Sequence, residues 1–338
     1  MNYPKCRICQ QRPATKTNSH IVPSFLVAKV CSYDGSGERD KEVMFTISPY
    51  GEKVYTGKIP STKYDELFDM EALSDERIEK ELKDNTVSED YIFCPSCEKK
   101  LSEILETPYA SYENKETYIS SDTKYMFWVS VVWRMSISEQ YGFRFPSIYE
   151  DQLQCALHNY MEAKENGNNA IGIINNCPIV FRIIKCTDIN VALYIDGDYD
   201  KKRNILSYLF GNIFLVASFK DELPGDYHYL GIEDNIRKAP ICKGNQDDDI
   251  MLIEETIFNK LNCNYAKQKA QIKRDFECQK ADVLWSAIGL SGQMPHHMKK
   301  ALIDRIYSEE AKLGDLLTLE RYEVVFKEIL QSFGYKPK

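Results

Sequence analysis

The sequence predicts an α+β protein made of a small cysteine-bearing module and a larger, mainly helical domain that contains a small antiparallel sheet. Two Cys-x-x-Cys pairs lie within the first 97 residues. Apolar positions recur with helical spacing over 123–141, over 149–164 and from residue 247 onward. Between residues 170 and 232 the pattern changes to short β-branched runs separated by turns. These features place the module at 1–110 and the larger domain at 111–338.

Composition indicates a folded protein that does not cross a membrane. The chain has 338 residues, of which 43% are hydrophobic and 28% are charged, as is typical of a globular protein with a sizeable core. The start of the chain lacks the apolar stretch of a secretory signal, and the longest apolar run, Met126 to Ile137, is too short to span a bilayer. We therefore expect a cytoplasmic protein whose 11 cysteines are mostly reduced.

The first 33 residues are basic, although the chain as a whole is acidic. The formal net charge is -8, but Met1 to Tyr33 contains no Asp or Glu. The positive charges of this segment are those of Lys5, Arg7, Arg12, Lys16 and Lys29. Such a cluster indicates a surface that faces phosphate groups, whereas a solvated face that arose by chance would have the same composition.

The elements expected within the module are short and separated by polar, turn-rich sequence. We expect a turn and a short hairpin at 12–18, and then an extended stretch over 19–23, because a residue that precedes proline avoids the helical region. The segment 33–92 is interpreted as an insertion. The other elements expected here are helices at 24–30, 74–82 and 98–106, and strands at 43–47 and 53–55.

The larger domain is expected to pack a sheet on helices. The run 123–141 is apolar on every side and predicts a buried helix, and Asn166-Gly167 ends the helix that follows. The segment 196–200 resembles the start of a calcium loop, but Lys201 stands where that loop requires glycine, so we expect a turn between strands. Strands are expected at 179–185, 190–195 and 213–219.

Two Cys-x-x-Cys pairs predict a structural zinc site with the ligands Cys6, Cys9, Cys94 and Cys97. Each pair supplies two thiolates from one tight turn, and four thiolates complete a tetrahedral zinc without an open position for a substrate. The long separation of the pairs is compatible with one site, because the cost of closing a loop grows slowly with its length. The alternative is four unrelated cysteines, buried or on the surface.

The residues around these pairs resemble the zinc-containing branch of the HNH endonucleases. Ser19-His20-Ile21-Val22-Pro23 follows the first pair, and the second pair opens a helix with Lys100 three residues after its last cysteine. The resemblance covers residues 1 to 106, about a third of the chain. It implies a ββα-metal fold, in which a hairpin and a helix hold one divalent cation, Mg²⁺ or a relative.

The resemblance also implies roles for three residues. His20 matches the general base that activates water, while the cation stabilises charge on the scissile phosphate. The family commonly has an acidic residue before this histidine and Asn or His after the last cysteine. This chain has Ser19 and Glu98 there, so these two residues are expected near the cation. The alternative for His20 is a zinc ligand or a structural histidine.

The function expected from these features is metal-dependent hydrolysis of phosphodiester bonds in nucleic acid, with DNA favoured. It would use a structural Zn²⁺ and a catalytic Mg²⁺ or Mn²⁺. The alternative is a non-catalytic zinc module that binds nucleic acid or a partner protein; a third option places the activity in residues 107–338. The larger domain is expected to serve targeting, regulation or oligomerisation, a layout similar to nuclease effectors of bacterial antiviral defence.

Overall fold

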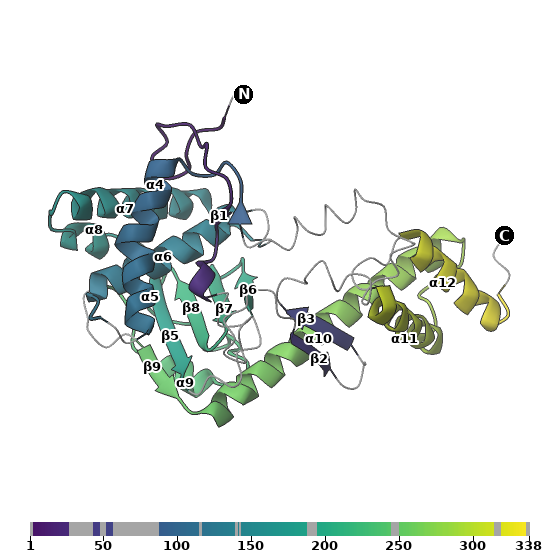
Figure 1. The fold of residues 1–338 in the computed structure, drawn as a ribbon. Coiled ribbons are helices and arrows are strands. Elements are labelled where there is room, and N and C mark those ends of the chain that lie inside the picture. The colour runs from purple at the N-terminus through teal and green to yellow at the C-terminus, as the bar shows by residue number, and fades with distance from the viewer. Residues whose placement is uncertain are drawn as a thin grey trace. The chain divides into compact units, whose positions relative to one another are not determined.

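The structure is a computed structural model that forms two compact units, each described here by itself (Figure 1). The first unit comprises Met1–Arg39 and Leu82–Lys260, and the second comprises Asp40–Glu81 and Leu261–Lys338. The expected helix at 74–82 and most of the expected strand at 190–195 lie outside the described residues. The structure describes residues 3–26, 43–47, 52–56, 88–114, 117–138, 141, 143–187, 195–244, 250–313 and 319–335.

A five-stranded sheet forms one layer of the first unit, with strand order β6-β7-β8-β5-β9. Its neighbours pair antiparallel, except that β5 and β9 are parallel. The sheet is therefore mixed, and the expectation of a purely antiparallel sheet is wrong at this edge. The strands are β5 (Val180–Cys186), β6 (Ile195–Asp200), β7 (Ile205–Phe210), β8 (Ile213–Ser218) and β9 (Ile250–Ile253).

Strand β6 corrects the expectation of a turn at 196–200. These residues pair along their whole length with β7, and the turn follows them at 201–204. The Asp200 carboxylate accepts hydrogen bonds from the backbone N–H groups of Lys202 and Arg203 there. Gly197 is required for the pairing, since a Cβ at this position would lie 2.1 Å from the ring of Tyr208. The glycine that suggested a loop thus serves a close approach between strands.

Helix α6 (Ser121–Ile137) is the centre of the first unit and confirms the buried helix expected at 123–141. Fifteen of its residues are buried, so it has no solvent face. It packs against α7 (Ser147–Glu165), which ends at Asn166 as expected. The same core includes Trp128 and Trp133, residues of β5 and β7, and the four cysteines. The first unit therefore continues through residue 110, where the sequence predicted a domain boundary.

The remaining helices of the first unit are α5 (Thr107–Glu113), α8 (Ile171–Asn175) and α9 (Glu233–Lys238).

A π-helical segment, η3 (Leu101–Glu106), joins α4 (Pro95–Lys100) to α5 in one helical run. Pro108 explains why the run widens here, because proline has no N–H to donate to residue 104 and its ring crowds that carbonyl. π-helical turns re-aim the side chains that they carry and are frequent at functional sites. The consequence here concerns Glu106, which η3 turns toward α6.

The second unit contains a hairpin and most of three helices. Strands β2 (Val43–Ile47) and β3 (Glu52–Thr56) pair antiparallel and confirm the two strands expected there. The helices are α10 (Glu255–Ala287), which starts in the first unit, α11 (His296–Leu313) and α12 (Leu319–Ser332). Their core gathers Trp285, Met298, Leu302, Phe326 and Leu330, among others.

Candidate metal centre

The first cysteine pair lies in a tight turn near the N-terminus. The N–H of Gln10 donates to the carbonyl oxygen of Cys6 at 2.9 Å and closes the turn around the pair. Gln10 has φ 54°, a left-handed conformation that lets the chain reverse immediately after Cys9. The N–H of Cys6 then donates to the carbonyl oxygen of Arg12 at 2.8 Å. Local turn geometry alone therefore brings two thiols to the same side of the backbone.

The second pair opens a helix. Cys94 is the N-cap residue of α4 and has an extended backbone, and Pro95 takes the first helical position, where its missing N–H costs nothing. Cys97 follows in the first turn, and the N–H of Glu98 donates to the carbonyl oxygen of Cys94 at 3.1 Å. The ring of Phe93 stacks on Trp133 of α6, with centroids 6.1 Å apart. The position of this pair is thus fixed by the main core.

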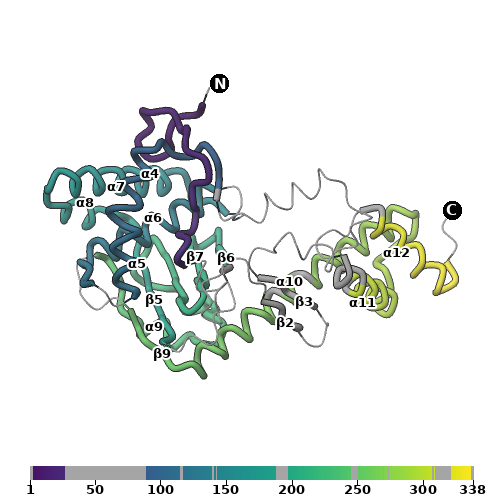
Figure 2. Tube along the Cα trace, viewed as in Figure 1, coloured from purple at the N-terminus to yellow at the C-terminus, as the bar shows by residue number. Residues whose placement is uncertain are grey.

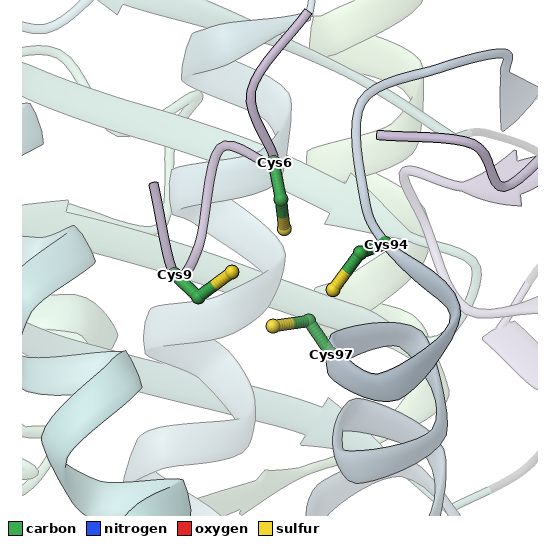
Figure 3. A group of neighbouring side chains, drawn as sticks. All are labelled: Cys6, Cys9, Cys94 and Cys97. Carbon is green, nitrogen blue, oxygen red and sulfur yellow. The ribbon is translucent and has the colours of Figure 1, made fainter. Parts of the chain in front are cut away.

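The two pairs come together into one buried group (Figure 3). The four Sγ atoms of Cys6, Cys9, Cys94 and Cys97 lie within 4.8 Å of one another, and at most 7% of each residue is exposed. A tetrahedral zinc with Zn–S bonds of about 2.3 Å separates its sulfurs by about 3.8 Å. The N–H of Arg7 also donates to the carbonyl oxygen of Ile92 at 2.9 Å, which joins the two turns directly. The cluster can hold a metal ion and is consistent with a structural zinc.

The thiols already interact without a metal. A hydrogen bond from the Cys97 side chain lowers the pKa of Cys6 to about 4, and further hydrogen bonds to the backbone act in the same direction. The same hydrogen bond raises the pKa of Cys97, and burial raises the pKa of Cys94. The thiolate form is therefore favoured at Cys6 and disfavoured at Cys94 and Cys97. A divalent cation would supply the positive charge that lets the remaining thiols ionise together.

His20 lies on β1 (Ser19–His20), which pairs antiparallel with β4 (Ser88–Glu89). Ser19 is opposite Glu89, and His20 is opposite Ser88. The strand that accompanies His20 thus comes from the far end of the predicted insertion. The expectation of a hairpin at 12–18 is wrong. Residues 14 and 16 instead make backbone hydrogen bonds to Pro4 and Phe93.

Ser19 and Glu98 meet, as their assignment to one site required. Ser19 is fully buried, and its hydroxyl lies close enough to Glu98 to favour the ionised carboxylate. Burial nevertheless raises the pKa of Glu98 overall, against the lowering effects of Arg134 and Ser19. Ser19 Oγ and Glu98 Oε2 are both buried and complete no hydrogen bond of ordinary geometry with the described residues. Two buried oxygen atoms that still need a partner therefore face the same small region.

Arg134 also belongs to this region, although the sequence analysis gave it no role. It is buried on α6, and its Nη1 donates to the carbonyl oxygen of His20 at 2.8 Å and to Glu106 Oε1 at 2.7 Å. Its Nε donates to the carbonyl oxygen of Ser130 at 3.2 Å. One guanidinium thus connects α6, β1 and η3. The sequence signal was an arginine in the last turn of a helix whose neighbouring residues are mostly apolar.

The candidate catalytic residues do not form a second group of close metal ligands. Within the described ranges, the four cysteines are the one set of three or more His, Cys, Asp and Glu ligands with mutual separations within 4.8 Å. His20 is not a member of that set, which removes the zinc-ligand alternative for the cluster described here. A cation beside Ser19 and Glu98 would need water and a phosphate for its other ligands.

Comparison with protein-family models, with curated proteins and with solved structures finds no match for this chain. In the part of the chain that the structure describes, no helix has the length and apolarity needed to cross a membrane.

Proposed function

We propose that the chain is a zinc-stabilised, HNH-like nuclease that hydrolyses phosphodiester bonds in nucleic acid, with DNA as the favoured substrate. The observation that carries the proposal is the succession of β1, β4 and α4. A strand with His20 pairs with a second strand, and the helix that follows presents Glu98 to Ser19. This is the strand, strand and helix order that the HNH resemblance implies.

In this proposal each part has a separate chemical role. The four cysteines hold a structural Zn²⁺ that fixes α4 against the N-terminal turn. His20 accepts a proton from the attacking water, which a neutral imidazole can do near pH 7. Ser19 and Glu98 would hold a Mg²⁺ or Mn²⁺, and the cation would supply positive charge to the scissile phosphate. Arg134 holds the backbone of His20 through its carbonyl oxygen.

A second candidate is a non-catalytic zinc module that binds nucleic acid. The observation in its favour is that His20, Ser19 and Glu98 bring one carboxylate to the region, where hard cations usually find several oxygen ligands. The N-terminal turn is basic in either case, since Lys5, Arg7 and Arg12 are exposed. The two candidates differ in one measurable property, the cutting of the bound strand.

Replacing His20 by alanine is expected to lower the rate of metal-dependent DNA cleavage by at least about 100-fold, the lower end of what a positioned general base contributes. The measurement is cleavage of supercoiled plasmid in Mg²⁺ or Mn²⁺ by the purified full chain. The control variant is His228→Ala, because that side chain is 97% exposed. Both variants should retain the zinc content of the wild type.

The outcomes separate the two candidates. Cleavage by the wild type that persists in His20→Ala would remove His20 from the mechanism. Binding of DNA by the wild type without cleavage in either cation would reject hydrolysis and support the non-catalytic module. Cleavage that stops in His20→Ala and continues in His228→Ala is the result that the nuclease proposal requires.

A further inference from the structure

Two exposed tyrosines form a pair beside the metal centre. Tyr3 and Tyr91 are each 39% exposed, and their ring centroids lie 5.3 Å apart with an interplanar angle of 42°. They come from opposite ends of the module sequence. Figure 2 shows the N-terminal segment lying close to the segment that precedes α4. Tyrosine rings have an apolar face and a polar hydroxyl, so an exposed pair offers a surface on which a flat ligand can stack.

The backbone holds Tyr91 outward. Its φ is 61°, a left-handed conformation that a bulky residue rarely adopts and that persists only where the surroundings enforce it. The enforcing contacts are the hydrogen bonds from Tyr91 N–H to the carbonyl oxygen of Lys16 at 2.8 Å and from Lys16 N–H to that of Phe93 at 3.1 Å. The ring is therefore presented by a fixed turn directly before the second cysteine pair.

Three basic residues belong to the segments that carry this tyrosine pair. Lys5 lies two residues after Tyr3, Arg7 donates its N–H to Ile92 next to Tyr91, and the carbonyl of Lys16 binds Tyr91 itself. Residues 3–26 contain no Asp or Glu. Of the nearby acids, Asp90 accepts the N–H of Asn18 at 2.7 Å and Glu89 accepts the hydroxyl of Ser138. Both acids keep their charge in these hydrogen bonds, so the segments carry these three basic residues against two acidic ones. The balance is positive and complements a phosphate backbone.

We infer that the tyrosine pair and the basic residues beside it in the chain, Lys5, Arg7 and Lys16, bind a single-stranded or frayed nucleic acid. One unpaired base stacks on a tyrosine ring. The inference rests on the proposed nucleic-acid function and specifies its substrate class. Aromatic faces stack on unpaired bases, whereas the bases of an intact duplex are already stacked on one another. A base between the two rings would need a spacing of about 7 Å, so it stacks on an outer face of the pair.

The test measures binding separately from cleavage. Fluorescence anisotropy compares a labelled thymidine 12-mer with a blunt duplex of the same length, in low salt without added Mg²⁺ or Mn²⁺. Tyr91→Ala is expected to weaken single-strand binding by roughly 5- to 100-fold, the effect of losing one stacked base, and to change duplex binding by less than about twofold. Tyr91→Phe keeps the ring and should bind like the wild type.

Matched variants distinguish the ring from the charge and from general damage. Tyr118→Ala removes a tyrosine that is 83% exposed elsewhere on the same unit and should leave binding unchanged. Lys5→Gln with Arg7→Gln should weaken both ligands and reduce the slope of log affinity against log salt by about 1.4 for the single strand. Each variant is checked for wild-type zinc content, because loss of the metal would unfold the turn that carries Tyr91.

Three results would overturn the inference. They are wild-type single-strand affinity in Tyr91→Ala, a preference of the wild type for the duplex, or no measurable nucleic-acid binding at low salt, which would leave the surface to a protein partner. The proposed hydrolysis is tested independently of the docking site. Single-strand binding that depends on Tyr91 without any cleavage would reject the nuclease and keep the docking site. Cleavage that depends on His20, together with single-strand binding that does not depend on Tyr91, would keep the nuclease and reject the docking site.

Discussion

Replacing Cys94 by serine is expected to remove most of the bound zinc and to destabilise the first unit by several kcal/mol. Cys94 is both a member of the four-sulfur group and the N-cap residue of α4. A whole structural zinc contributes about 10–16 kcal/mol in small zinc-binding peptides, which sets the upper limit. Three thiolates and a neutral hydroxyl hold zinc weakly, because zinc in structural sites prefers four N or S ligands.

The effect should be large because the metal joins segments far apart in the sequence. The first turn has few apolar residues of its own, and Ile8 and Ala14 are its buried contribution beside the cysteines. Backbone hydrogen bonds from Arg7 to Ile92, from Lys16 to Phe93 and from Tyr91 to Lys16 also hold the N-terminal segment. The Gln154 side chain of α7 donates one more to the carbonyl oxygen of Ile8. Neutral hydrogen bonds of this kind contribute about 1 kcal/mol each. A zinc bound by the four cysteines would therefore be the strongest single interaction between the turn and α4.

Metal analysis and urea unfolding measure this effect together. The wild type should contain one equivalent of zinc, Cys94→Ser should contain less than about half, and its unfolding midpoint should fall. Cys155→Ser is the matched control, because Cys155 is an exposed cysteine of α7 outside the group. Wild-type zinc content and stability in Cys94→Ser would show that the four sulfurs do not form a metal site.

Replacing Arg134 by methionine is expected to destabilise the first unit by about 3–5 kcal/mol, the usual cost of removing one partner of a buried ion pair. The change removes the buried donor that serves both the His20 carbonyl and Glu106. Glu106 is 23% exposed, so water can solvate it in part, and the lower end of that range is expected. Methionine keeps most of the apolar stem of arginine, so the loss of unfolding free energy comes from removing the guanidinium and not from opening a cavity.

The measurement is urea unfolding followed by tryptophan fluorescence in a Trp285→Phe background. Trp128 and Trp133 then report the first unit, because they lie on α6 with Arg134. Arg144→Met is the control: Arg144 is 3.9 Å from Glu150, its side chain is 49% exposed, and such surface pairs contribute about 0–1 kcal/mol. An equal, small effect of both substitutions would show that Arg134 does not connect the three elements.

Features encoded by neighbouring residues were predictable from the sequence. The two cysteine pairs, the strands at 43–47 and 52–56, the buried helix α6 and the end of α7 at Asn166 all follow from local turn chemistry or from apolar periodicity. The same local reasoning failed at 196–200, where Asp and Gly indicate a turn. The strand forms because Gly197 allows the ring of Tyr208 to pack against the backbone, and that neighbour is not visible in the local pattern.

The candidate site was predictable by residue type and not by arrangement. Sequence alone determined which four sulfurs could bind a metal and singled out His20, Ser19 and Glu98. Only the tertiary structure decided that β4 is the partner strand of β1, that Glu98 faces Ser19, and that Arg134 binds the backbone of His20. The reason is physical. A turn depends on residues next to one another in the chain, whereas a strand pair or a buried charge depends on residues that meet only after the core has formed.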